Sequence, residues 1–292
     1  MKKNNRNLYP FAMTIPAIII YSLFAIVPII MGICLSFTDW NIKRWQEPVF
    51  SGLLNYQEVL SNDIFFTALK NTMIYAFSTS ILKVIMGLAL ALVLAKAFKG
   101  NGIFRTIFYL PCVISITVIG VLFSAILAKN GLFNNVLEFL NLEMLQREWL
   151  GRYGTAFSWI IFIDSWMWAG FNMFIFISGL QAISQDYYEV ADIEGASKIA
   201  QFFKITVPLL IPAITVNTTL NIAGGMKVFD IVYVLTNGGP GTDTQVLATF
   251  AFRTYGIGLL GESSAANIIL TVLVIVISLT LNRIFRNMEV EL

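Results

Sequence analysis

Four charged side chains lie inside long apolar stretches of the sequence, where a charge is costly and usually serves a pathway, a partner or an ion pair. Lys227 and Asp230 are three residues apart and could meet on one helix face. Lys83 lies near the middle of the second stretch and could equally pair with a carboxylate not identified in the sequence, and Asp164 lies in the fourth stretch. A structural ion pair is the favoured interpretation for these charges, ahead of direct contact with a ligand.

A second group of candidate residues, made up of amides, tryptophans and a glycine, also lies inside the long apolar stretches. Amides inside a membrane suit the hydroxyl groups of a sugar, a tryptophan ring offers a stacking surface, and glycine permits an unwound turn beside a cavity. Amides also join transmembrane helices and tryptophans mark membrane interfaces, and this structural interpretation is the favoured one. The candidates for a solute path are Trp166, Trp168, Asn172, Asn217, Asn221 and Gly225.

Residue types for catalysis and metal binding are sparse. The sequence has no histidine, which removes the commonest metal ligand and the commonest general base near neutral pH. Cys34 and Cys112 each lie in an apolar stretch without metal-type spacing, so we expect two buried thiols. A G-x-G-x-x-G match at residues 256–261 follows no strand, and no phosphate-binding G-x-x-x-x-G-K-[ST] occurs. We therefore expect no catalytic residues, no metal, no cofactor and no ATP hydrolysis by this chain.

The elements that position these residues are predicted to be membrane helices. Of 292 residues, 57% are hydrophobic and 12% charged, with a mean hydropathy of +0.76, which is too little charge for a water-soluble surface. The net charge of +2 does not indicate a nucleic-acid partner. The sequence predicts an all-α integral membrane protein, a single domain over residues 1–292. Six stretches meet the bilayer's need for about 20 apolar residues. They lie near 10–37, 67–97, 104–128, 156–182, 206–235 and 263–285.

The basic residues predict the orientation of these six spans. The more basic side would hold Lys2, Lys3, Arg6, Lys96, Lys99, Arg105, Lys198, Lys204, Arg283 and Arg286. The other side would hold Lys43, Arg44, Lys129, Arg147, Arg152 and Arg253. Because cytoplasmic loops carry the excess of lysine and arginine, we expect both termini and the segment 187–205 to be cytoplasmic.

The segment 187–205, between the fourth and fifth predicted spans, is charged and prone to form helix. It follows Ser184-Gln185-Asp186, a plausible helix start. Gly195 would allow a sharp bend, and Pro208 suits the start of the next helix. Apolar residues recur at helical spacing, at Val190, Ile193, Ala196, Ile199 and Phe203. From these features alone, a solvated loop with an interfacial helix and a docking helix for a partner have equal weight.

Within this segment a known signature is present. Glu189, Ala191, Gly195, Ile205 and Pro208 have the spacing of the cytoplasmic signature of bacterial binding-protein-dependent ABC importer permeases. Val190 and Val207 replace the usual alanine and leucine. The chain resembles this family, and in particular its maltose-type carbohydrate branch, over most of its length. Further matches are Phe37-Thr38-Asp39-Trp40, Asn55-Tyr56, Phe104-Arg105-Thr106, Tyr109-Leu110-Pro111 and Leu235-Thr236-Asn237-Gly238-Gly239-Pro240 with Thr244.

The resemblance implies a transport subunit of the bacterial cell membrane that imports a sugar or oligosaccharide. Its implied partners are two cytoplasmic ATPase subunits, an extracytoplasmic solute-binding protein and a related second permease, which together with this chain forms a heterodimer. The residues implied to couple transport to the ATPase are Glu189, Ala191, Gly195, Ala196, Ile205 and Pro208.

Three alternatives stay open at this point. The solute could instead be glycerol phosphate, an amino acid or another small polar molecule. An ion-coupled secondary transporter would need inverted repeats and an intramembrane coupling site, and no such repeat is visible. A membrane enzyme would need convergent catalytic groups, which the scattered acidic residues do not provide.

Overall fold

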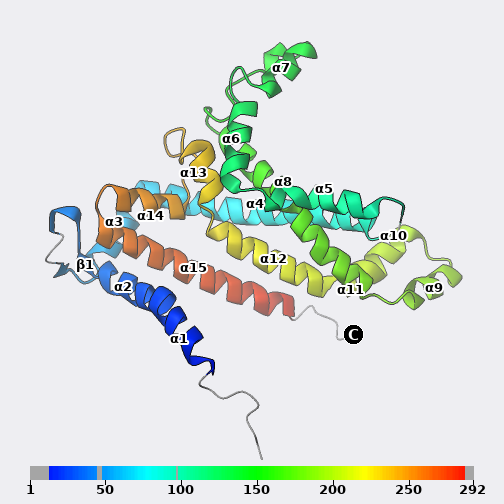
Figure 1. The fold of residues 1–292 in the computed structure, drawn as a ribbon, viewed down its shortest axis with the longest axis horizontal. Helices are drawn as coiled ribbons and strands as arrows, with labels where there is room; N and C mark the ends of the chain where they lie inside the picture. Colours follow the sequence, from blue (N-terminus) through cyan, green and yellow to red (C-terminus); the bar gives the residue numbers. More distant parts are fainter. Residues whose placement is uncertain (1–12, 45–47, 97, 287–292) are drawn as a thin grey trace, which may run out of the picture. The chain divides into compact units, whose positions relative to one another are not determined.

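The computed structural model describes residues 13–44, 48–96 and 98–286. The predicted basic residues Lys2, Lys3 and Arg6, and the start of the first predicted span, lie outside the described residues. The chain divides into two compact units, one of residues 1–62 with 251–269 and one of residues 63–250 with 270–292. We describe each unit by itself (Figure 1).

The larger unit is organised around one long helix, α4 (Asp63–Leu94). This helix packs against α8 (Thr155–Gln181) and α12 (Ile211–Met226), and α5 (Asn101–Val113) packs against α8 (Figure 1). Glycines allow two of these close approaches, as is common between membrane helices. A Cβ on Gly170 would overlap the backbone of Phe108, and a Cβ on Gly87 would overlap the side chain of Asn172.

Two of the six predicted spans are bent rather than straight. The third runs through α5 and α6 (Ile116–Ile126), which meet at 93°. Pro111 removes one helical hydrogen bond just before the bend, and Ile114 is extended, with φ −74° and ψ 142°. The fifth joins Lys198–Leu209 to α12 at 64°. The described residues thus hold four helices long and apolar enough to cross a membrane, or up to six such spans when each bent pair counts as one, which confirms the predicted fold class.

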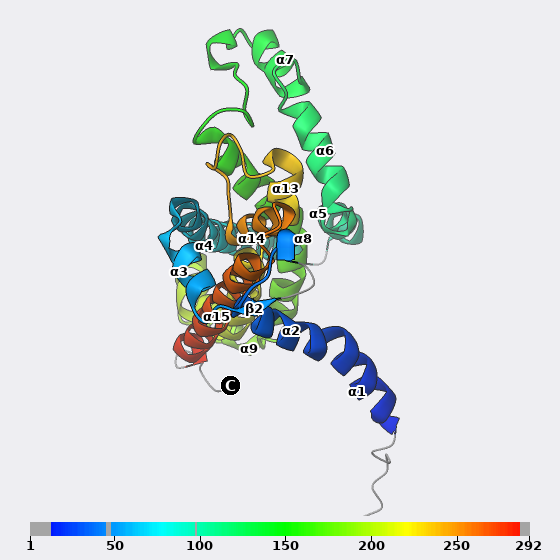
Figure 2. The ribbon, with the colours of Figure 1, turned by 90° about the vertical axis from the view of Figure 1, so that its left-hand side faces the viewer.

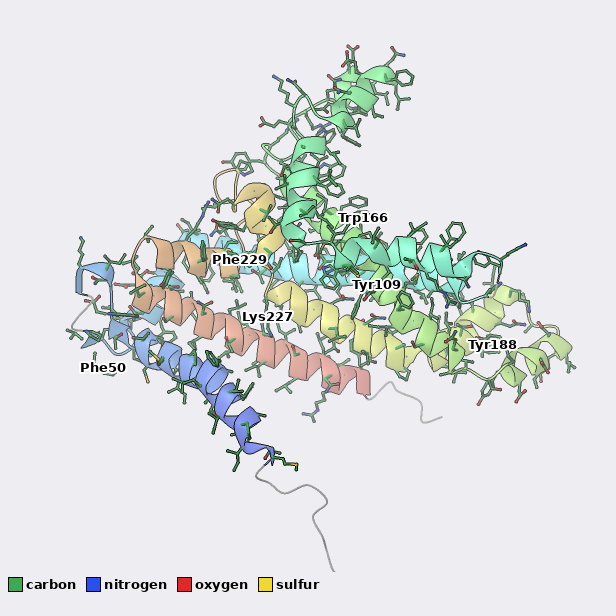
Figure 3. The ribbon with its side chains drawn as sticks, viewed as in Figure 1. Phe50, Tyr109, Trp166, Tyr188, Lys227 and Phe229 are labelled. Carbon is green, nitrogen blue, oxygen red and sulfur yellow. The ribbon has the colours of Figure 1, made fainter. Side chains whose placement is uncertain are left out.

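The fifth predicted span, 206–235, is wrong at its second end. The helix α12 ends at Met226, where the Lys227 N–H donates to the carbonyl of Gly224. A short non-helical segment, residues 227–229, precedes α13 (Asp230–Thr236), and Lys227 and Phe229 in this break are labelled in Figure 3. Lys227 and Asp230, which their spacing predicts to share one helix face, are therefore separated by a helix break.

The larger unit also contains several short helices. These are α7 (Leu132–Phe139), η4 (Glu143–Leu145), α9 (Asp186–Ile193), α10 (Lys198–Gln201), η5 (Phe202–Thr206) and α11 (Val207–Leu209). Figure 2 shows α7 at the far end of α6. Two buried apolar clusters hold the long helices together, one around Ile160, Ile163 and Met167 and one around Met173 and Phe176.

The smaller unit begins with a continuous apolar helix made of α1 (Ile15–Tyr21), η2 (Ser22–Ile26) and α2 (Val27–Ser36). Strand β1 (Thr38–Asp39) pairs antiparallel with β2 (Val49–Phe50). The short helix η3 (Ile42–Arg44) lies between the two strands in the sequence, and α3 (Leu54–Ser61) follows β2. The Asn55 amide donates to the carbonyls of Ser36 and Thr38 at 2.8 and 2.9 Å and fixes this turn. Helices α14 (Leu247–Gly256) and α15 (Leu260–Arg286) each run from one unit into the other.

The prediction of two buried thiols is wrong. Cys34 is exposed and Cys112 is half-buried. The reason for Cys34 is that no residue in the most apolar window of Ile15–Ser36 is buried within the described chain. Such a helix is suited to lipid or to another membrane subunit, because apolar side chains in a bilayer need no protein cover.

Candidate functional site

A buried ion pair in the larger unit joins α4 to α8. Lys83 Nζ lies 2.6 Å from Asp164 Oδ2, and both side chains are less than a tenth exposed. The carboxylate that pairs with Lys83 thus lies on a different span. A buried pair of this kind neutralises two charges that could not remain separate in a medium of low dielectric constant.

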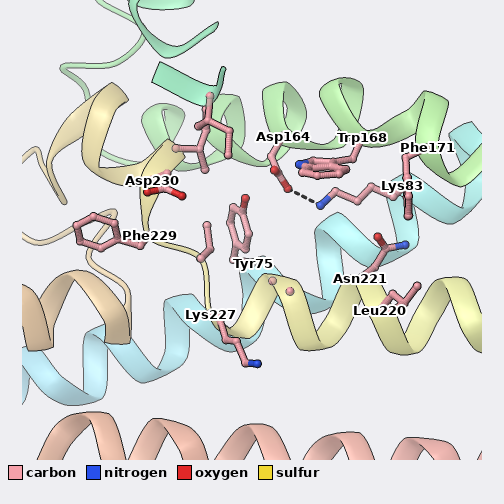
Figure 4. Close-up of a pocket in the computed structure, with 15 residues that line it drawn as sticks. Tyr75, Lys83, Asp164, Trp168, Phe171, Leu220, Asn221, Lys227, Phe229 and Asp230 are labelled. Atoms are coloured by element: carbon pink, nitrogen blue, oxygen red, sulfur yellow. Dashed lines mark ion pairs between the residues drawn. The ribbon is translucent and has the colours of Figure 1, made fainter. Parts of the chain in front are cut away.

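This ion pair lines a cavity of about 300 Å³ between α4, α8, α12 and α13 (Figure 4). The aromatic residues Tyr75, Trp168 and Phe171 and the amide residue Asn221 also line the cavity. Of the predicted solute-path and charged residues, seven come together here. They are Lys83, Asp164, Trp168, Asn221, Gly225, Lys227 and Asp230.

Three predicted solute-path residues lie outside this cavity. Trp166 lines a separate apolar pocket beside α5 and contacts Phe123, with ring centroids 5.6 Å apart. Asn172 is buried beneath the cavity, where its amide donates to Trp168 O at 2.9 Å and its oxygen accepts from Asn221 at 2.6 Å. Asn217 is 1% exposed, and neither of its amide atoms has a hydrogen-bond partner among the described residues.

The expected contact between Lys227 and Asp230 is not present in the described part of the chain, where no ion pair joins them. Both side chains are exposed, and in Figure 4 the Lys227 ammonium points away from the Asp230 carboxylate. The helix break after Met226 separates them, so the three-residue spacing no longer places them on one face.

The predicted coupling segment folds into two helices joined by a tight turn. Helix α9 ends in the glycine motif common at helix C-termini: the Ala196 N–H donates to Ala191 O at 2.9 Å and the Gly195 N–H to Asp192 O at 3.1 Å. Gly195 has φ +77°, which other residues adopt only with strain. Ser197 then caps α10, accepting from the Ala200 N–H at 3.3 Å.

Apolar side chains on this segment lie exposed. Val190, Ile193, Ile199 and Phe203 are all more than half exposed. Because the turn at Gly195 interrupts the helix, these residues do not form the single continuous face that their spacing predicts. Of the coupling candidates, Glu189 and Gly195 are exposed, Ala191 is buried, and Ala196, Ile205 and Pro208 are half-buried.

A polar clamp that the sequence analysis missed holds the two helices together. Lys198 Nζ donates to both carboxylate oxygens of Asp192, at 2.8 and 3.1 Å, and the Gln201 amide donates to Asp192 Oδ1 at 2.5 Å. These hydrogen bonds from Lys198 and Gln201 hold the pKa of the Asp192 carboxyl below its ordinary value. Tyr188, labelled in Figure 3, adds a 2.9 Å hydrogen bond to Thr206. Serine is a common N-cap residue, so Ser197 is the residue from which the sequence could have predicted this turn.

A second missed cluster ends α4 near the same end of the unit. Arg105 donates to the carbonyl of Leu94 through Nε at 3.1 Å and Nη2 at 2.6 Å, and the Asn101 amide donates to Leu94 O at 2.9 Å. These groups satisfy a carbonyl that the helix end leaves without a partner. The described residues contain no group of three or more His, Cys, Asp or Glu side chains that could hold a metal ion.

Comparison with known proteins agrees with this architecture. The family described as binding-protein-dependent transport system inner membrane component matches residues 83–289. A probable ABC transporter permease protein of Bacillus subtilis (strain 168), YurN, is 35% identical and covers 99% of each chain. The trehalose/maltose transport system permease protein MalF of Thermococcus litoralis is 35% identical over 91% of this chain and 89% of its own. The crystal structure of a bacterial alginate ABC transporter, in complex with an alginate pentasaccharide-bound periplasmic protein, contains a chain of TM-score 0.81 and 26% identity. The match covers 95% of this chain and 93% of that one. The predicted resemblance is confirmed: this chain belongs to the family of binding-protein-dependent transport system inner membrane components.

Proposed function

We propose that this chain is the permease through which an ATP-driven importer moves an uncharged sugar or oligosaccharide into the cytoplasm. The observation that carries the proposal is the likeness, over 91% of this chain, to a permease named for trehalose and maltose transport. The structural relative is named for alginate, an acidic polysaccharide, so it extends the likeness to longer saccharides but does not itself support an uncharged solute. The solute would arrive on an extracytoplasmic binding protein and leave at the opposite membrane face.

The charges in the cavity favour an uncharged solute. Lys83 is neutralised by Asp164, and the remaining charged residues that line the cavity, Lys227 and Asp230, are one of each sign. A phosphate or carboxylate is normally held by a surplus of positive charge and matched hydrogen-bond donors. Rings and an amide, from Trp168, Phe171 and Asn221, are better suited to a sugar's apolar face and hydroxyl groups. This argues against glycerol phosphate as the solute.

The coupling segment supports an external ATPase. Its exposed apolar residues Val190 and Ile193 follow the exposed Glu189 on the same helix. Together they give a small apolar surface beside one carboxylate, to which a partner could bind. The turn at Gly195 presents this surface as a compact unit. We infer that each of two ATPase subunits docks one permease here, and that Glu189, Ala191, Gly195, Ala196, Ile205 and Pro208 form or support the contact.

The same arrangement suggests the orientation and the assembly. With α9 in the cytoplasm and each bent pair counted as one span, four spans precede α9 and two follow it, so both termini lie on the cytoplasmic side, as the basic residues predict. The second permease is a related chain, so the translocation path lies within a heterodimer and this chain supplies one wall of it.

Transport assays on the reconstituted importer test the proposal. Proteoliposomes with binding protein outside, both permeases and ATPase should take up radiolabelled trehalose, maltose or longer neutral oligosaccharides only when ATP is enclosed inside the vesicles, at the ATPase face. Glycerol phosphate should not compete. Uptake that persists without ATP and follows an ion gradient would favour a secondary transporter instead. Saturable uptake of glycerol phosphate would move the solute class to phosphorylated polyols.

A further inference from the structure

The short helix α7 presents three distinct faces. Successive residues of an α-helix are rotated by about 100°. On this basis Phe133, Asn134 and Leu137 share one sector, and Asn135 and Glu138 share a second. The third sector holds Leu132, Val136, Phe139 and Leu140. The first sector is buried or half-buried, and the other two are exposed.

The inward face is held by a buried amide. Asn134 is 2% exposed and donates to Lys129 O and Arg147 O, both at 2.9 Å, while its oxygen accepts from Trp149 Nε1 at 2.9 Å. Gly131 is required for the entry to α7, because a Cβ there would overlap the carbonyl of Ile126. The orientation of α7 is therefore fixed by the fold, and its apolar outer face does not result from loose packing.

The apolar outer face has nothing over it within the described chain. Phe139 is 86% exposed, and Met144 in the following turn is 98% exposed. This is the reverse of a helix on a water-soluble surface, where the polar residues face outward. A helix with an apolar sector beside a polar one is typical of helices that lie in the plane of a membrane interface.

The neighbours of α7 place it at the depth of such an interface. Phe133 contacts Trp149 and Trp159, each with ring centroids 5.2 Å apart. Trp159 is four residues into α8, so it lies about 6 Å from the start of this membrane span. The Arg147 guanidinium lies 4.9 Å from the Trp149 ring. Tryptophan and arginine together mark the level of lipid headgroups.

The lipid-facing surface also continues onto the adjacent span. Trp159 contacts Phe162, with ring centroids 5.8 Å apart, and Phe162 is half exposed on the outside of α8. We propose that α7 is an interfacial helix whose Leu132–Val136–Phe139–Leu140 face rests in the lipid leaflet beside the start of α8, with Glu138 directed to water. It would stabilise the bent span α5–α6 at its far end, next to α7.

Collision measurements on spin labels test this contact with lipid. The complete importer would be reconstituted in lipid vesicles, with Cys34→Ala and Cys112→Ala and one new cysteine, at Phe139→Cys or, as the matched control one residue away, Glu138→Cys. The label at position 139 should collide with oxygen, which concentrates in lipid, more often than with a water-soluble nickel chelate. The label at position 138 should show the opposite preference.

Two results would overturn the proposal. Frequent collisions with the nickel chelate at position 139 would place the apolar face in water. Protection from both reagents there would mean that a protein partner covers the face. If the Phe139→Cys variant fails to assemble, Met144→Cys repeats the measurement, because the native Met144 side chain makes almost no contacts. Its label should then prefer oxygen, and preference for the chelate or protection from both would count equally against the proposal.

Discussion

Two lysine–aspartate pairs in this chain have nearly the same nitrogen-to-oxygen separation and opposite surroundings. Lys83 and Asp164 are 2.6 Å apart and their side chains are 7% and 8% exposed, whereas Lys198 and Asp192 are 2.8 Å apart and 77% and 54% exposed. The first pair joins α4 to α8, and the second clamps a turn in the proposed coupling segment. From the distances alone, the two pairs would be expected to contribute equally to stability. The free energy lost when one charge is left without its partner depends on burial, however.

The largest effect should come from breaking the buried pair. Lys83→Met leaves the Asp164 carboxylate without its partner, and losing one partner of a buried pair costs about 3–5 kcal/mol. We expect a strongly lowered melting temperature of the purified importer and little assembled protein. Size-exclusion chromatography and thermal denaturation in detergent would measure both.

The double variant Lys83→Met/Asp164→Leu is the matched control for this experiment. Removing both charges should recover most of the lost stability, because no buried charge remains. Recovery of stability together with normal uptake would mean that the pair is structural. Recovery of stability with loss of uptake would place the pair in the solute path. A stable single variant would show that water reaches Asp164 freely and would weaken the contrast between the two pairs.

The next effect concerns the turn that the exposed pair supports. Gly195 has φ +77° and open space around its Cβ position, so a side chain there meets no steric block and is opposed only by backbone strain of about 1–2 kcal/mol. Gly195→Asp should leave the protein in the membrane but abolish uptake, because the docking surface of α9 is turned and a new charge is added beside it. Uptake and co-purification of the ATPase would be measured together.

Gly102→Ala serves as the control for the Gly195 variant. Gly102 lies inside α5 with ordinary helical backbone and no neighbouring atom near its Cβ position. Alanine there should be neutral or slightly stabilising, by up to about 1 kcal/mol. A full transport rate with Gly195→Asp would contradict the assignment of this turn to coupling.

A smaller effect is expected from the amides beside the buried pair. Asn221 donates to Asn172 at 2.6 Å and lines the cavity, so Asn221→Leu removes one interhelical hydrogen bond, worth about 0.6 kcal/mol in membrane proteins. Stability should change little. If Asn221 also binds the solute, the KM for uptake should rise about tenfold, equivalent to roughly 1.4 kcal/mol.

Asn217→Leu is the matched comparison for Asn221→Leu. Asn217 lies one turn earlier on α12, and its buried amide has no hydrogen-bond partner among the described residues. Replacing it should keep or raise stability and leave the KM unchanged, because no bond is lost. Equal KM values for the Asn221 variant and the parent importer would remove Asn221 from the solute path.

The sequence predicts the long elements well because their signal is local. A run of about 20 apolar residues is sufficient to identify a span, so the helices at Asp63–Leu94, Thr155–Gln181 and Leu260–Phe285 lie within a few residues of their predicted positions. The coupling segment is also local, since its signature residues and its caps lie within 25 residues of one another.

What the sequence does not predict depends on contacts between distant residues. The partner of Lys83 is 81 residues away on another span, and its identity follows only from the packing of α4 on α8. The 93° bend between α5 and α6 needs an extended Ile114, which no residue preference at that position requires. Lys227 and Asp230 illustrate the opposite case. Their short spacing predicts a contact, but the helix ends before Lys227 and the next one begins at Asp230, so the contact is not formed.

The smallest effect should be the acid sensitivity of the exposed pair. The pKa of Asp192 is lowered in the folded chain, so its clamp is fully formed above the ordinary aspartate pKa and is lost only as pH falls through the lowered value. At neutral pH the clamp is complete, and salt should weaken it because both side chains are exposed to solvent.

Hydrogen exchange of the amides in residues 194–201, corrected for the intrinsic pH dependence, should therefore quicken on acidification and at high salt. Asp192→Asn should remove both dependences, whereas Glu194→Gln, which changes a neighbouring exposed carboxylate outside the clamp, should keep them. Identical profiles for the two variants would mean that the turn is held by Gly195 and the Ser197 cap alone, and that the exposed pair contributes nothing measurable beside them.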